Sequence, residues 1–71
     1  MRTELNITQS HLGRVRFGAD GAISALTRAL NNGELDWQTR SNVLAARSCI
    51  ETARKQADEA MRIVSELRRE G

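Results

Sequence analysis

The feature that most constrains the fold of this chain is an unbroken heptad of apolar residues in its second half. From residue 43 to residue 67, apolar positions recur at steps of three and four residues in strict alternation, with charged residues between them. This spacing is typical of a helix that packs along one side against another helix. The positions of the seam are Val43, Ala46, Ile50, Ala53, Ala57, Ala60, Val64 and Leu67. With Asp36 as N-cap and arginines in the last turn, we expect one long helix over about residues 37–69.

A weaker form of the pattern runs through the first half. Its positions are Leu12, Val15, Ala19, Ala22, Leu26 and Ala29. Gly33 follows them and suits the left-handed conformation that often ends a helix. With Thr8 as N-cap, we expect a helix over about residues 9–31 and a partly ordered arm over residues 1–7. A competing interpretation breaks this helix at Gly18–Gly21 and leaves Arg14–Phe17 as a short strand, because its charged and apolar residues alternate.

The expected fold is therefore all-α: one domain over residues 1–71, built as an antiparallel two-helix hairpin with its turn at residues 32–35. No internal repeat is evident. The second helix is expected to extend past the first, and its apolar stripe is wider than one neighbouring helix covers. We therefore expect a homodimer with a four-helix arrangement, or a different protein that supplies the missing contact.

Charge and composition narrow the class of partner. The net charge is +2 and the pI is near 9.5, but the second half has balanced charges spaced four residues apart. On a helix these charges are neighbours and predict ion pairs on a solvated face, which favours a protein partner over nucleic acid. The pairs are Glu51–Lys55, Arg54–Asp58, Asp58–Arg62 and Arg62–Glu66. No apolar run reaches the roughly 18 residues of a membrane span, so we expect no membrane partner.

The residues of enzyme chemistry are scarce. One Cys and one His cannot form a metal site, and adjacent Asp58 and Glu59 point about 100° apart on a helix. We interpret Cys49 as a small buried hydrophobic residue, and an unpaired Cys predicts a reducing compartment, most simply the cytoplasm. We therefore expect no enzyme, no catalytic residue, no cofactor and no metal.

Trp37 has two interpretations. It caps the loop end of the hairpin by packing on Leu30 or Leu26, which we favour, or it anchors the chain in a pocket of a partner protein. The apolar residues predicted to bind a partner are Trp37, Leu44, Met61, Ile63 and Leu67. The predicted function is a small protein-binding inhibitor, adaptor or chaperone that covers a surface its partner needs.

The alternative function follows from the strand interpretation of residues 14–17. A strand followed by two helices resembles, in outline over residues 14–50, a ribbon-helix-helix repressor. That resemblance implies a small dimeric DNA-binding regulator with Arg14 and Arg16 on a paired strand in the major groove. The chain departs from the family where its Gly-x-Ser turn reads Gly33-Glu34-Leu35, and where its second helix is much longer. Small helical-hairpin chaperones and phage- or bacterium-encoded antagonists of regulators are also similar in size and architecture.

Overall fold

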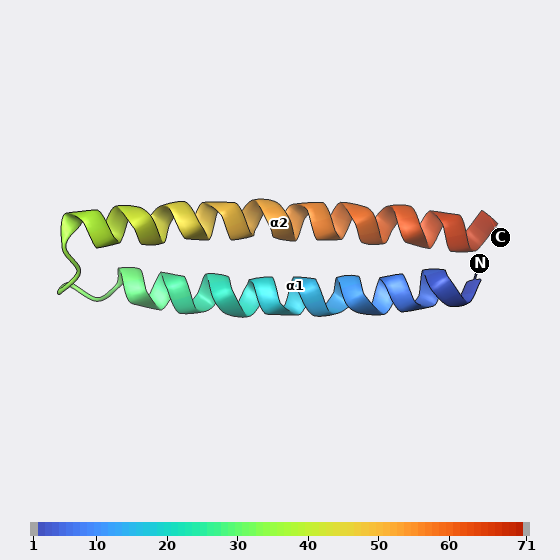
Figure 1. Ribbon diagram of the computed structural model, residues 1–71, viewed down its shortest axis with the longest axis horizontal. Helices are drawn as coiled ribbons and strands as arrows, with labels where there is room; N and C mark the ends of the chain where they lie inside the picture. The colour runs from blue at the N-terminus through green and yellow to red at the C-terminus, as the bar shows by residue number, and fades with distance from the viewer. Residues whose placement is uncertain (1, 71) are drawn as a thin grey trace.

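The protein is an antiparallel pair of long helices. A computed structural model describes residues 2–70, with helix α1 over Arg2–Leu30 and helix α2 over Trp37–Glu70. The helices lie side by side along their whole length, and both ends of the chain are at the end opposite the loop (Figure 1). The rod measures 53 × 14 × 13 Å, with a radius of gyration of 16.2 Å. A globular domain of this length would have a radius of about 11 Å, so the structure has almost no interior.

The start of α2 is fixed by local interactions, as the sequence predicts. The Asp36 side chain accepts a hydrogen bond from the backbone N–H of Thr39 at 2.7 Å, and its carbonyl accepts one from the N–H of Arg40 at 3.0 Å. Asp36 is thus the N-cap of α2. Hydrogen bonds from the side chain and the backbone of Thr39 lower the pKa of the Asp36 carboxyl below its ordinary value.

The end of α1 differs from the prediction. No glycine among residues 2–70 has a positive φ, so Gly33 does not form the left-handed cap. Instead, Arg40 from the first turn of α2 donates hydrogen bonds to the carbonyls of Leu30 at 2.8 Å and Asn32 at 3.2 Å. A cation therefore satisfies carbonyl groups at the negative end of the α1 dipole, which removes the need for a glycine cap.

The N-terminal boundary of α1 was also predicted wrongly. The helix begins at Arg2, and the hydroxyl of Thr8 donates to the carbonyl of Glu4 one turn earlier, so Thr8 is not an N-cap. Residues 2–7 of the predicted arm are helical, whereas Met1 and Gly71 lie outside the described residues. Because α1 is this long, α2 does not extend past it, and Val64 near the end of α2 is buried.

The strand interpretation is wrong as well. Arg14–Phe17 is part of α1, and the described chain, residues 2–70, contains no strand. Gly13, Gly18 and Gly21, on either side of this segment, do not break the helix, because the tertiary packing of α1 along α2 outweighs their low helix propensity. Over the same residues, neither helix has a stretch long and apolar enough to cross a membrane.

Candidate functional site

The contact between the helices uses only part of the predicted heptad seam. Taking Val43 as heptad position a, the a residues Ala57 and Val64 are buried, and Val43 and Ile50 are half-buried. At position d, Ala46, Ala53 and Leu67 are exposed and Ala60 is half-buried. Position e is turned toward α1 instead, where Arg54 and Met61 are half-buried. The seam is thus rotated, so that each helix presents its a and e positions to the other.

Polar contacts follow one edge of this seam as a ladder. Gln9 donates a hydrogen bond to the Ser65 hydroxyl at 2.8 Å, and Arg47 contacts the Thr27 hydroxyl at 3.4 Å. Between them lie two ion pairs, Arg16–Asp58 at 3.2 Å and Asp20–Arg54 at 2.5 Å. In all four pairs the two residue numbers add up to 74, so the ladder holds a single antiparallel register.

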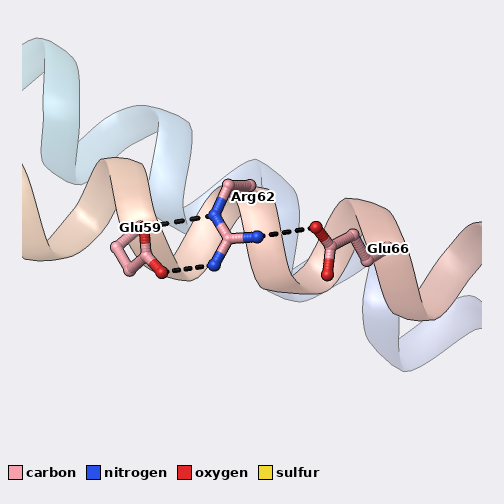
Figure 2. Close-up of polar contacts among 3 residues, drawn as sticks. All are labelled: Glu59, Arg62 and Glu66. Carbon is pink, nitrogen blue, oxygen red and sulfur yellow. Dashed lines mark hydrogen bonds and ion pairs between the residues drawn. The ribbon is translucent and has the colours of Figure 1, made fainter.

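The prediction that Arg54 and Asp58 pair with each other within α2 is therefore wrong. Both side chains cross to α1, while Arg62 and Glu66 do form the expected local pair at 2.6 Å. Figure 2 shows Arg62 between Glu59 and Glu66 on the exposed surface of α2. The hydrogen bond and the charge of Arg62 lower the pKa of the Glu59 carboxyl.

The ladder reveals an internal repeat that the sequence analysis missed. Arg16, Ala19, Asp20 and Ala22 recur 38 positions later as Arg54, Ala57, Asp58 and Ala60. Conservative pairs continue the match at the same offset, namely Leu5 and Val43, Leu12 and Ile50, Leu26 and Val64, and Thr27 and Ser65. The signal was present as the pattern Arg-x-x-Ala-Asp-x-Ala. It explains why the ladder is symmetric, because each helix contributes the same residue types to both sides of the contact.

The opposite edge of the seam is formed by the d and g positions of both helices. We call its part over residues 8–29 of α1 and residues 46–67 of α2 the uncharged flank, because Glu4 and Glu70, also at g positions, place charges beyond this part at the open end. In α1 it consists of Thr8, His11, Val15, Gly18, Ala22, Ala25 and Ala29. In α2 it consists of Ala46, Cys49, Ala53, Gln56, Ala60, Ile63 and Leu67. None of these fourteen residues is Asp, Glu, Lys or Arg. In contrast to the polar ladder, this part of the edge carries no acidic or basic side chain between residues 8–29 and 46–67.

The uncharged flank is bulky at one end and flat at the other. Val15, Ile63 and Leu67 are each about half exposed, at 45% to 52%; Ile63 and Leu67 lie near the end of α2 at the open end of the hairpin, and Val15 lies near the middle of α1. Ile7, 53% exposed, borders the same end. Toward the loop, the flank consists of alanines and Cys49. Large exposed apolar side chains concentrated on one face are typical of an interaction surface.

The five predicted partner-binding residues do not form one surface. Ile63 and Leu67 belong to the uncharged flank. Met61 is half-buried on the ladder side, where a depression of about 290 Å³ lies between Met61, Phe17 and neighbouring α1 residues. Trp37 and Leu44 are seven residues, or two helical turns, apart and therefore share one side of α2 close to the loop.

Trp37 does not pack as the cap we favoured from the sequence. It is 78% exposed, and Leu44 on the same side is 44% exposed. The loop end is closed instead by the Arg40 side chain, through its hydrogen bonds to the carbonyls of Leu30 and Asn32. Sequence analysis missed a second aromatic residue of this kind, Phe17, which is 83% exposed. The signal was available, since Phe17 stands among charged and glycine residues off the α1 seam.

The residues with reactive side chains lie apart from one another. Cys49 is exposed, so the prediction that it is buried is wrong, because position g faces away from α1. His11 is exposed on the same flank near the other end. Within residues 2–70, no three His, Cys, Asp or Glu side chains lie close enough together to hold a metal ion.

The arginines named in the DNA-binding alternative are also placed. Arg14 is exposed on α1, and Arg16 is engaged by Asp58. Three other arginines, Arg2, Arg68 and Arg69, line a depression of about 370 Å³ at the open end. Glu66 and Glu70 lie beside Arg69, so this end does not present a surface of one sign.

No protein family, curated protein or solved structure matches this chain.

Proposed function

We propose that this protein is a non-enzymatic protein-binding module, dimeric in action, that inhibits, escorts or links a partner protein by covering a surface of it. The observation that carries the proposal is the exposure of Trp37 together with Leu44 on one side of α2. Tryptophan is among the residues that contribute most to binding when it enters a pocket of a partner. A monomeric chain has little reason to keep an indole in water.

The spacing of the two residues indicates how the contact would be made. Residues i and i+7 of a helix are the usual anchors when a helix lies in an apolar groove of another protein. Trp37 is the first residue of α2, so it reaches the groove without obstruction from α1. The Asp36 cap and the Arg40 contacts hold this end of the hairpin in place. Partner binding would then need little ordering of the chain, which favours affinity.

The DNA-binding alternative loses its structural support. A ribbon-helix-helix protein places arginines on a strand, whereas residues 14–17 are helical here. The Arg16 side chain is also used within the hairpin, in its pair with Asp58.

The test is a comparison of variants in affinity capture from cells that express the protein. Trp37→Ala and Leu44→Ala should lose a protein that the wild type retains, with unchanged helicity in far-ultraviolet circular dichroism. Phe17→Ala is the matched control, because it removes another exposed aromatic side chain and should retain the same protein. Capture that survives the combined loss of Trp37 and Leu44 contradicts the proposal.

A second measurement addresses nucleic acid directly. Binding to a mixed-sequence DNA duplex, followed by fluorescence anisotropy over a range of salt concentrations, should show negligible affinity. A steep salt dependence that flattens by about two phosphate contacts in Arg14→Ala with Arg16→Ala would instead support the DNA-binding regulator.

A further inference from the structure

We infer that the uncharged flank binds the same flank of a second copy of this chain, with the two hairpins antiparallel, so that the loop of each lies beside the open end of the other. This inference rests on the dimeric part of the proposed function and adds the surface and the orientation. It makes no use of Trp37 or Leu44, which lie on another side of α2.

The solvent-accessible area of the monomer is large enough to supply a contact of this kind. The hairpin exposes 5305 Å², whereas a compact folded protein of 7.9 kDa exposes about 4,400 Å². The excess of about 900 Å² is close to the roughly 800 Å² that each partner contributes to a standard protein interface. Among residues 2–70, only Ala19, Ala57 and Val64 are buried in the monomer, which is a very small core for two helices of this length.

The heptads indicate which face receives the second copy. In a four-helix bundle, the a and d positions of each helix point to a common core. Within the hairpin the a positions are covered and most d positions are not, although both carry apolar residues. A second hairpin on the uncharged flank covers the d positions of α1 and α2 together. The ladder edge cannot serve in this way, because it is lined with arginine and aspartate side chains.

The distribution of bulk along the flank sets the orientation. If the two-fold axis lies at the level of Gln56, Ile63 of one copy faces Cys49 of the other, and Leu67 lies within one residue of the level of Ala46. With the axis at Gly18, Val15 lies within one residue of the level of Ala22. The large side chains Val15, Ile63 and Leu67 then each face a small one, whereas Ala53 and Ala60 face each other next to the axis, and this keeps the helix axes evenly spaced. A parallel dimer would stack large on large at one end and leave the alanines apart at the other.

The pairings in α1 and in α2 place the axis at the same level of the hairpin to within one residue. The numbers 18 and 56 add up to 74, the sum found in the polar ladder, so Gly18 and Gln56 lie at the same level of the hairpin. A single two-fold axis therefore satisfies α1 and α2 at once. The same flank on both copies makes the contact isologous, so it closes at two chains. A Cβ added at Gly18 meets nothing within 4 Å in the monomer, which leaves room for a reporter there.

Disulfide crosslinking of the full chain tests the orientation. In a Cys49→Ser background, Gln56→Cys and Gly18→Cys lie next to the axis and should each give a covalent dimer under mild oxidation. Ser48→Cys, exposed on the outer side of α2, is the matched control and should not. Wild-type Cys49 should not crosslink either, because two copies of it lie about 14 residues, or about 21 Å, apart along the bundle. Crosslinking through Cys49, with none through Gln56→Cys, overturns the antiparallel arrangement.

Sedimentation equilibrium tests the surface. The wild type should have twice the chain mass of 7.9 kDa. Ala53→Glu, at a flank position exposed in the monomer, should weaken the dimer by roughly 100-fold or more, because it buries an unpaired charge. Ser48→Glu adds the same charge outside the flank and should leave the dimer intact. A dimer unaffected by Ala53→Glu overturns the choice of flank. A fully helical wild-type monomer overturns the dimer itself, and only this result also removes the dimeric part of the proposed function.

Discussion

Ala57 provides the most direct test of the packing between α1 and α2. It is 5% exposed at an a position, and its repeat equivalent Ala19 is also buried. Alanine at these positions lets the helix axes approach toward the short end of the usual range of about 8–10 Å. Ala57→Leu adds three carbon atoms where there is no space for them, so the helices must separate or the new side chain must leave its preferred rotamer.

The expected loss follows from that geometry. Overpacking of a filled site costs about 1–3 kcal/mol. For a domain of this size, 1 kcal/mol corresponds to a shift in melting temperature of about 4–8 °C. Ala57→Leu should therefore melt at least several degrees lower than the wild type. Ala19→Leu should show a loss of similar size, since the 38-residue repeat places it at the same position of the other helix.

Thermal denaturation followed by circular dichroism measures the effect, with all variants at equal protein concentration because a dimer melts in a concentration-dependent way. Ser48→Leu is the control, since it adds a leucine to the exposed outer side of α2. It should leave the melting temperature nearly unchanged. If Ala57→Leu melts at or above the wild-type temperature, the close approach of the two helices at this position is refuted.

Two further predictions concern charge. Asp20→Arg should destabilise the hairpin, because the buried Nε of Arg54, which makes no regular hydrogen bond, loses the carboxylate that it pairs with. Adding Arg54→Asp should restore most of the lost stability. A double-mutant cycle that shows no coupling between the two positions contradicts the ladder. Asp36→Ala should lower the melting temperature at neutral pH, whereas Asp36→Asn retains the cap. Because folding lowers the pKa of Asp36, its ionised carboxylate stabilises the fold at pH values above its ordinary pKa of 3.8. The advantage in stability of the wild type over Asp36→Asn should therefore vanish as the pH falls through the lowered pKa of the folded state. An advantage that persists at still lower pH refutes a stabilising role for the Asp36 charge.

Several features of the fold followed from the sequence because they depend on neighbours along the chain. The step of three and four residues predicted two helices, and Asp36 marked the start of α2 within one residue of its position in the structure. The start of α1 was predicted wrongly because threonine is a residue type common at N-caps, whereas Thr8 lies within the helix, where its hydroxyl donates a hydrogen bond to the carbonyl of Glu4. Of the candidate site, Trp37 was recognised from the sequence, but its exposure was not.

The sequence by itself determined that this chain forms two amphipathic helices joined by a short turn, because periodicity and capping are local properties. Only the tertiary structure decided how each helix is rotated about its axis. The apolar d positions favour a contact through a and d, yet the structure turns the e positions toward α1, although three of them in α2 are Arg47, Arg54 and Arg68. This rotation goes with two ion pairs across the seam. Arg54 and Asp58 have the right spacing to pair with each other within α2, but Arg54 binds Asp20 and Asp58 binds Arg16. Those long-range pairs turn the d and g positions outward, and that rotation creates the uncharged flank.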